Sequence, residues 1–331
     1  MSELDVSVVV PTYNRRAVLA RVLDALDHQT LDGERFEVIV VSDGSTDGTD
    51  ALLRTWEAAG PRRVALREAN AGPSVARNAG AAVASGRLLV FVDDDVVPSA
   101  DLLVHHLAAH RRAGGDVAGF GPMLRPVDSR QSPWVRWEHA MLEKSYDALA
   151  SGRWEPSPRL FYSGNASVPA SVFAAVGGFD ANRRRAEDTE LAYRLDDAGV
   201  GFVFAPDAVG WHHAERSLRS WLAIPGAYGV HDVETVRDGH AWLLDALIDE
   251  FPGRNRVTRV LTRLTVGRPA AIESATTVLV ALARLADRLG AERVGRGGFS
   301  LVHNLRYYDG LAGALGGRQV FLDAFVAGAR S

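Results

Sequence analysis

Three consecutive carboxylates, Asp93, Asp94 and Asp95, directly follow the apolar run Leu88–Val92. Carboxylates about 6 Å apart repel by roughly 3 kcal/mol per pair at an effective dielectric constant near 20. In an extended backbone Asp93 and Asp95 face the same side and Asp94 the other. Two oxygen ligands at this spacing suit Mg²⁺ or Mn²⁺, whereas a solvated acidic turn is the simpler explanation of the same residues.

A second acidic candidate is Asp43 in the string VVSDGSTDGT. Such strings commonly form a turn, and we expect Ser45 or Thr46 to cap the helix that follows. Asp43 would then stay free at the end of its strand. From there its carboxylate could accept the N3 proton of uracil or thymine.

Three further groups of residues carry chemistry, each with a plainer explanation beside it. Arg77 in NAGPSVARNAG is either a surface residue or a contact to a base or phosphate. Glu187 and Asp188 open a helix, where the helix dipole alone favours acidic residues. His212 and His213 follow a short strand, and an imidazole there is either structural or a metal ligand.

The segments between these residues predict how they are positioned. In the first hundred residues, β-branched runs such as Val6–Pro11 alternate with amphipathic helices such as residues 15–29. This alternation predicts a doubly wound α/β layer structure, in which ligands bind beyond the carboxyl ends of the strands. Three strand ends should therefore meet at one site; they are 11–14 (Pro11, Thr12, Tyr13 and Asn14), Asp43, and 93–95.

The remainder of the chain has a looser pattern. Residues 116–230 predict short strands and helices, and residues 231–331 predict helices throughout. We therefore expect a catalytic domain at 1–230, with a Rossmann-like nucleotide-binding half at 1–115 and an acceptor half at 116–230, followed by a helical C-terminal region at 231–331.

Composition limits the functional classes. The 331 residues are 47% hydrophobic with a formal net charge of −4, which argues against a nucleic-acid partner. Cysteine is absent, so disulfides and thiolate metal sites are excluded. The start MSELDVSVVV is unlike a signal peptide, and the apolar stretch Ser274–Gly290 is expected to fall short of a membrane span. These features predict a cytoplasmic protein, with peripheral contact to the inner face of a membrane left open.

Five motifs occur together in order: VSVVVPTYNR, FEVIVVSDGSTDGT, NAGPSVARNAGAAVASGRLLVFVDDDVVP, VGGFD and AEDTELAYRL. With this ordered set the sequence resembles the inverting family-2 glycosyltransferases from about Val6 to Arg219. The resemblance implies a GT-A fold with a mixed α/β sheet. It also implies transfer of one sugar from a nucleotide-diphosphate sugar, UDP or dTDP by expectation, to an acceptor hydroxyl.

The resemblance also implies roles for individual residues. Asp188 is implied as the general base with Glu187 beside it, and Mn²⁺ or Mg²⁺ as the cofactor. The residues implied to bind the nucleotide sugar are Pro11, Thr12, Tyr13, Asn14, Asp43, Arg77, Asp93 and Asp94. Gly164 and Asn165 are implied to shape the sugar and acceptor pocket. Metal binding through an Asp-x-Asp motif is implied for Asp93 and Asp95, together with His212.

Other functions remain open at this point. A processive synthase is disfavoured, because RSLRSW departs from the Gln-x-x-Arg-Trp motif of such enzymes. A sugar nucleotidyltransferase would show a Gly-rich loop after the first strand, and VVVPTYNRR contains no glycine. A non-catalytic nucleotide-sugar-binding protein would bind the donor but give no turnover. The acceptor, whether a glycan, natural product or lipid-linked molecule, and homodimer formation are left open.

Overall fold

The computed structural model describes residues 4–127, 129–183 and 185–327, which divide into two compact units. The first unit comprises residues up to 130 together with 139–214, and the second comprises 131–138 and the residues from 215 onward. The boundary expected between residues 230 and 231 falls inside α8 (Leu218–Arg237), so the helical part begins earlier along the chain than we expected.

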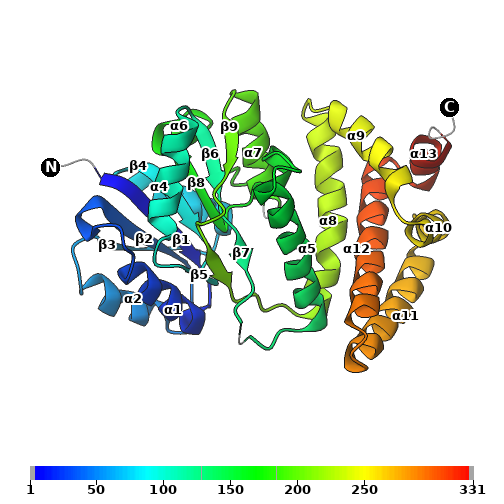
Figure 1. The fold of residues 1–331 in the computed structure, drawn as a ribbon, viewed down its shortest axis with the longest axis horizontal. Helices are drawn as coiled ribbons and strands as arrows, with labels where there is room; N and C mark the ends of the chain where they lie inside the picture. The colour runs from blue at the N-terminus through cyan, green and yellow to red at the C-terminus, as the bar shows by residue number, and fades with distance from the viewer. Residues whose placement is uncertain (1–3, 128, 184, 328–331) are drawn as a thin grey trace. The chain divides into compact units, whose positions relative to one another are not determined.

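A mixed seven-stranded sheet forms the centre of the first unit (Figure 1). The strand order is β3-β2-β1-β4-β8-β6-β9; β1 to β4 are parallel, and β8 runs antiparallel to both β4 and β6. This confirms the predicted α/β class. The strands are β1 (Leu4–Thr12), β2 (Phe36–Asp43), β3 (Arg63–Glu68), β4 (Gly86–Val92), β6 (Val117–Phe120), β8 (Asn165–Pro169) and β9 (Gly201–Phe204).

Helices cover both faces of this sheet, which explains the nearly continuous apolar runs in its strands. In β1, Val6, Val8 and Val10 join the core formed with α1, whereas Val9 points to the opposite face. The helices of this unit include α1 (Arg16–Asp27), α2 (Thr49–Glu57), α3 (Pro73–Val83), α4 (Leu102–Ala113), α6 (Ala170–Ala175) and α7 (Glu187–Asp197).

A second, three-stranded sheet was not predicted. It consists of β5 (Val96–Pro98), β10 (Gly210–His212) and β7 (Met123–Leu124), with β10 in the middle. Its register places His212 opposite Val96, the residue that follows the three aspartates. A short strand at His212 and His213 was expected, but two or three residues are too few to indicate which strands pair, so the sheet itself was not predicted.

The second unit is helical, as predicted. Its helix α12 packs against α8, α10, α11 and α13, with Trp221, Phe299 and Val302 in the core. Besides α8, the helices are α9 (Trp242–Glu250), α10 (Arg256–Thr265), α11 (Pro269–Arg288), α12 (Glu292–Leu315) and α13 (Arg318–Leu322), while α5 (Pro133–Ala150) contributes residues to both units.

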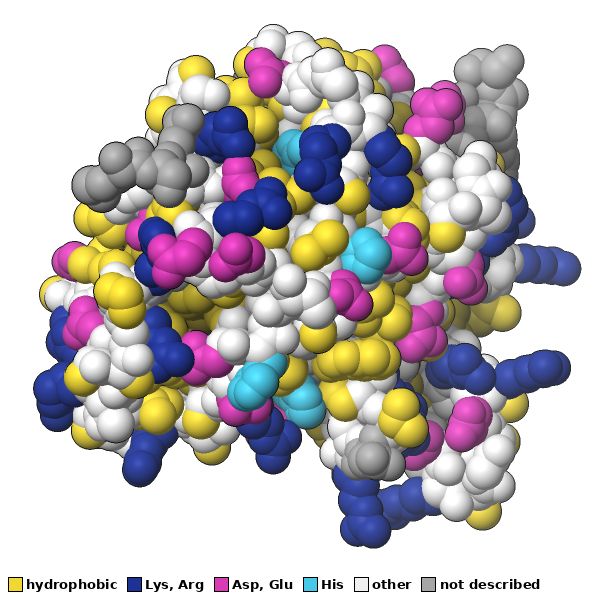
Figure 2. Space-filling model, turned by 60° about the vertical axis from the view of Figure 1, so that its left-hand side comes forward, with side chains coloured by type: hydrophobic (Ala, Val, Ile, Leu, Met, Phe, Trp, Pro, Cys, Tyr) yellow, Lys and Arg dark blue, Asp and Glu magenta, His cyan; other side chains and the backbone are white. Residues whose placement is uncertain are grey.

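Helix α11 is longer than the apolar stretch expected from the sequence. Its 20 residues have a mean hydropathy of 1.3 in the most apolar window, which makes α11 the one helix among the described residues that is long and apolar enough to cross a membrane. Core helices of soluble proteins meet the same criterion, so this is weak evidence for a span. Figure 2 shows acidic and basic side chains interspersed on the face that it presents.

Candidate active site

The parallel strands β1 and β4 mark the point where the chain reverses its direction across the sheet. From β1 the chain builds outward through β2 to β3, and β4 then pairs with the other side of β1. The pairing of β1 with β4 extends to Val9 and Phe91, whereas β1 itself continues to Thr12. Pro11, which lacks an N–H, lies in this last part of β1. Ligands of doubly wound sheets bind at such a switch point.

The three aspartates lie in a turn directly after β4, in which the N–H of Val96 donates to the carbonyl of Asp93 (3.0 Å). The expectation that Asp93 and Asp95 face the same side of an extended strand is therefore wrong. Each carboxylate has its own partner in the fold. Asp94 accepts a hydrogen bond from the Thr12 hydroxyl (2.7 Å), which ties this turn to the end of β1.

Arg77 on α3 bridges two acidic motifs that lie far apart in the sequence. Its Nη2 lies 2.6 Å from Asp93 Oδ1, and its Nη1 lies 3.0 Å from Glu187 Oε1. The guanidinium is buried and packs over the ring of Phe179 at 5.4 Å. Although burial lowers the pKa of Arg77, the charges of Asp93 and Glu187 more than compensate and raise it above its usual value. Arg77 is therefore a buried ionic bridge, and a simple surface role is excluded.

The bridge places the N-terminus of α7 beside the aspartate turn. Asp188, in the first turn of α7, accepts a hydrogen bond from the N–H of Thr189 (2.8 Å). Burial raises the pKa of Asp188 to about 7, and the negative charge of Glu187 adds to this effect. The N-cap residue of α7, Ala186, is buried with a φ of 55°, a conformation that costs free energy for a residue with a Cβ. Such strain is typical of functional sites.

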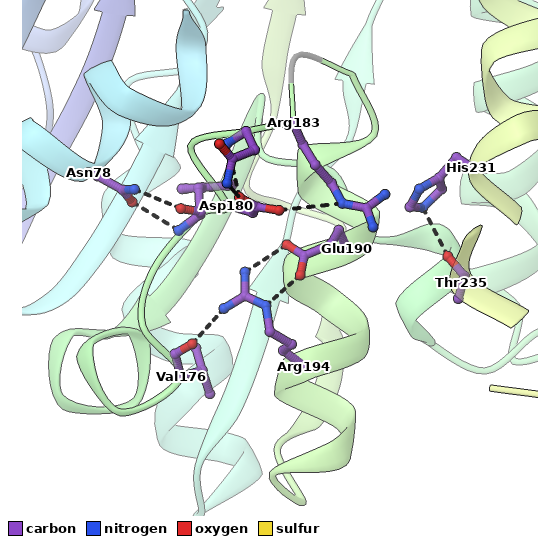
Figure 3. A network of polar contacts seen from close by, with 10 residues as sticks. Asn78, Val176, Asp180, Arg183, Glu190, Arg194, His231 and Thr235 are labelled. Carbon is purple, nitrogen blue, oxygen red and sulfur yellow. Dashed lines mark hydrogen bonds and ion pairs between the residues drawn. The ribbon is translucent and has the colours of Figure 1, made fainter. Parts of the chain in front are cut away.

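A set of contacts from α3 holds the segment that leads into α7 (Figure 3). Asn78 donates to the carbonyl of Phe179 (2.8 Å) and accepts from its N–H (2.9 Å). Within α7, Arg194 pairs with Glu190 and also donates to the carbonyl of Val176 (2.5 Å). Asn78 and Phe179 therefore fix the position of Arg77. They were not predicted as site residues, although both lie in motifs that were singled out, ARN and GGF.

The loops after β1 and β2 hold each other. Asn14, with a φ of 53°, accepts from the N–H of Thr46 (2.7 Å), and its own N–H donates to Ser45 Oγ (3.1 Å). The expected cap of α2 is wrong, because it is Asp47 that accepts from the N–H and hydroxyl of Thr49, at the start of that helix. Tyr13 is exposed beside this pair of loops, as a residue that meets a ligand would be.

Asp43 is buried rather than free. Its two carboxylate oxygens accept from the N–H groups of Ala71 (2.7 Å) and Gly72 (2.9 Å), just before α3. This carboxylate thus fixes the loop that leads to Arg77. A base would have to use the remaining lone pairs of Asp43.

The two predicted pocket residues differ in their surroundings. A Cβ on Gly164 would lie 2.7 Å from Asp93 Oδ2, so any other residue at this position would displace this carboxylate. The side chain of Asn165 is fully buried and is bound to His106 and to the carbonyls of Pro122 and Ala208. Asn165 is therefore a structural residue of the sheet, and its predicted contact with a sugar is not supported.

Two of the three predicted metal ligands face each other. His212 Nε2 lies 3.6 Å from Asp95 Oδ1, and Arg15 Nη1 lies 3.5 Å from Asp95 Oδ2. Two ligand atoms that lie at right angles around a cation, each about 2.1 Å from it, are about 3 Å apart. Asp95 Oδ1 and His212 Nε2 would therefore have to approach each other only slightly to bind one cation. In the part of the chain that the structure describes, no three His, Asp or Glu side chains are already grouped around a cation position. Asp93 is bound instead by Arg77.

Comparisons with known proteins identify the family of the chain. The family model for glycosyl transferase family 2 matches residues 7–189, more than half of the chain. The validoxylamine A glucosyltransferase of Streptomyces hygroscopicus subsp. limoneus is 33% identical over 232 residues, covering 62% of this chain and 50% of that protein. The pre-mycofactocin glycosyltransferase of Mycobacterium tuberculosis (strain H37Rv) is 30% identical over 238 residues, covering 69% of this chain and 47% of that protein. The chain thus spans about half the length of these relatives.

Solved structures share the fold. The mannosyltransferase PcManGT from Pyrobaculum calidifontis, in complex with GDP-Man and Mn²⁺, aligns with a TM-score of 0.62 at 21% identity, covering 93% of this chain and 88% of that one. TarS 1-349 of S. aureus, in complex with UDP, aligns with a TM-score of 0.53 at 18% identity, covering 92% and 90%. The fold is of the expected GT-A type. Together with the match of the family model, this shows that the chain belongs to glycosyl transferase family 2.

Proposed function

We propose that this chain is a metal-dependent inverting glycosyltransferase that moves one sugar from a nucleotide-diphosphate sugar to an acceptor hydroxyl, with Asp188 as the general base. One observation carries the proposal: the bridge from Asp93 through Arg77 to Glu187. It joins the aspartate turn at the switch point of the sheet to the acidic start of α7. A donor held at the turn would therefore have its sugar beside Asp188.

The surroundings of Asp188 suit proton abstraction. Its pKa of about 7, raised mainly by burial, lies near neutral pH, where a general base is most effective. In an inverting displacement the carboxylate takes the proton of the acceptor hydroxyl as its oxygen attacks the anomeric carbon. The bond from that carbon to the diphosphate breaks in the same step. Arg77 keeps Glu187 in place and favours ionisation of Asp188.

A divalent cation fits the donor set of Asp95 and His212, which pairs a carboxylate with an imidazole, as Mn²⁺ accepts. When bound, such a cation would stabilise the negative charge on the leaving diphosphate. The solved mannosyltransferase that contains Mn²⁺ supports this assignment. Asp93, whose Oδ1 is bound to Arg77, is better suited to orienting the donor than to being a primary ligand.

The nucleotide base would lie near Tyr13 and Asp43. Uracil and thymine, each with an N–H that a carboxylate can accept, are the bases predicted from the sequence. Guanine offers the same chemistry, and both UDP and GDP-Man occur in the related structures. The proposal therefore covers bases that donate an N–H, with UDP and dTDP sugars to be tested first.

The test has two steps. A thermal-shift screen of nucleotide sugars, with and without Mn²⁺, identifies the donor, because a ligand that binds only the folded state raises its stability. Transfer or donor hydrolysis is then measured for the wild-type chain and for Asp188→Asn. We expect the variant to bind the donor normally but to lose turnover by about 10²- to 10⁴-fold. Comparable turnover would reject Asp188 as the base, and donor binding by the wild type without any turnover would favour a non-catalytic binding protein.

A further inference from the structure

Helix α11 exposes an apolar stripe on the side that faces away from its core. Ile272, Thr276, Val280 and Ala283 are buried within the second unit. On the opposite side Val278, Leu282, Leu285 and Leu289 are 51–75% exposed. At about 100° per residue these four side chains fall within about 60° of one another. A helix on the surface of a soluble protein normally presents polar residues there.

The neighbouring helix α10 has an inverted pattern. Its buried side chains are threonines, namely Thr258, Thr262 and Thr265, whereas Val257, Val260 and Leu264 are 44–56% exposed. Aliphatic side chains on the outside and hydroxyls on the inside are unfavourable in water. The two helices follow each other in the chain and are in contact (Figure 1), so two neighbouring helices of the second unit each expose an apolar stripe.

Arginines are concentrated in the same segment. From Arg256 to Arg288, which covers α10, α11 and the turn between them, there are six arginines and two acidic residues, although the whole chain carries a net charge of −4. Arg284 and Arg288 lie within the apolar part of α11, and Arg293 follows it. Arginine can place its aliphatic stem along an apolar layer while its charged group stays at a polar boundary. An anionic surface over an apolar layer matches this combination.

We propose that α10 and α11 form a membrane-binding surface that lies on a bilayer containing anionic lipids, with the two aliphatic stripes inserted at the level of the head groups. A spanning arrangement of α11 is disfavoured, because Val280 and Ala283 belong to the core with Trp221 and Phe299, and Asp287 is paired with Arg136. A second copy of the chain is a poorer occupant, since a symmetric contact would bring like-charged arginines together. This surface is independent of the proposed transfer reaction.

The test is co-flotation of the whole chain with phosphatidylcholine vesicles that contain or lack phosphatidylglycerol. We expect binding to the anionic vesicles alone, with release as salt is raised. The triple variant Val278→Ser, Leu282→Ser, Leu285→Ser should lose at least tenfold in partitioning. Arg284→Gln with Arg288→Gln should lose roughly fivefold per arginine at low salt. The matched control, Val83→Ser with Val127→Ser, changes two exposed aliphatic residues of the first unit and should bind like the wild type.

Each contrary result overturns the proposal. Equal flotation of the wild type and the triple variant, or no flotation of the wild type, removes the membrane surface. A dimer in sedimentation analysis that the triple variant abolishes, without vesicle binding, would assign the stripes to contact between copies. Membrane association that resists both high salt and alkaline extraction would assign α11 as a spanning helix. Thermal unfolding of each variant confirms that it is folded, because the substituted side chains are largely exposed.

Discussion

Replacing Arg77 with methionine should separate the ionic bridge from the reaction it is proposed to support. The change keeps a long side chain beside Phe179 but removes the charge that joins Asp93 to Glu187. Two consequences are expected: a less stable fold, and an Asp188 carboxyl that ionises only at higher pH.

The stability loss follows from leaving carboxylates without their cation. Removing one partner of a buried ion pair typically costs about 3–5 kcal/mol. The side chain of Asp93 is 35% exposed and that of Glu187 is 14% exposed, so water can solvate part of the charge that is left behind. We therefore expect a loss of about 2–3 kcal/mol in the free energy of unfolding for Arg77→Met.

The effect on Asp188 is electrostatic. Arg77 lowers the pKa of this carboxyl, against burial and the charge of Glu187, which raise it to about 7. The N–H of Thr189 also lowers this pKa, and more strongly than Arg77 does. Without Arg77 the acidic limb of kcat/KM, on which activity rises with pH as Asp188 ionises, should therefore move upward by about one pH unit, which corresponds to about 1.4 kcal/mol.

The assay is the pH dependence of kcat/KM for the donor found by screening, together with urea unfolding. Arg77→Lys retains the charge and should keep the acidic limb close to that of the wild type. Arg194→Met is the matched control, because it removes another arginine–carboxylate pair from α7, that with Glu190 (Figure 3). It should lower stability without moving the limb. An unchanged pH profile in Arg77→Met, measured where the variant is folded, would refute the assignment of Arg77 as the residue that tunes Asp188.

Three further outcomes are expected. Gly164→Ala places a methyl group 2.7 Å from Asp93 Oδ2. It should lower kcat/KM at least tenfold and the free energy of unfolding by about 1–3 kcal/mol. The control Gly115→Ala, where a Cβ meets nothing within 4 Å, should change neither quantity. Asp95→Ala should abolish the part of nucleotide affinity that depends on Mn²⁺, measured by calorimetry with and without the metal; an equal loss in both conditions would indicate a folding defect. Burial lowers the pKa of His106 to about 4, so between pH 4 and 6.5 the folded state binds fewer protons than the unfolded state. The neutral imidazole should therefore contribute about 3 kcal/mol to the free energy of unfolding near neutral pH. This contribution is lost as the pH falls from 6.5 toward 4. His106→Gln should flatten this part of the pH dependence of the unfolding free energy, and an unchanged slope would contradict a neutral buried imidazole.

Regular elements of the fold were predictable because their signals are local. The β-branched run of β1 and the apolar stripe Leu191, Ala192 and Leu195 of α7 follow the periods of a strand and a helix, and all three residues of that stripe are buried. The small sheet of β5, β7 and β10 was not predicted, because its strands are short and its pairing joins residues between about 90 and about 115 positions apart. Arg77 and Glu187 are also far apart in the sequence. From the sequence alone Arg77 could therefore be either a surface residue or a ligand contact, and only the structure shows Glu187 beside it.

Orientation at the ends of elements was harder to predict than their existence. The two-residue period that would align Asp93 with Asp95 applies inside a strand, and β4 ends at Val92. The cap of α2 was assigned to the wrong side chain for a related reason. Several residues of STDGT can accept a backbone N–H, and only the turn geometry selects Asp47. Asn165 has a polar side chain of the kind that lines sugar pockets. Its position on β8, where the side chain binds the carbonyl of Ala208, makes it structural.

The charges of the aspartate turn explain why a cation suits this site. Asp93 and Glu187 are compensated by Arg77, and the raised pKa of Asp188 keeps much of that carboxyl protonated below neutral pH. Asp95 has Arg15 and His212 at 3.5 Å and 3.6 Å, so its compensation is looser than that of Asp93. A pyrophosphate that approached this edge without a counterion would meet carboxylates whose arginine is already engaged. A cation between Asp95, His212 and the phosphates would remove that repulsion, and it could do so without disturbing the Arg77 bridge on which the ionisation of Asp188 depends.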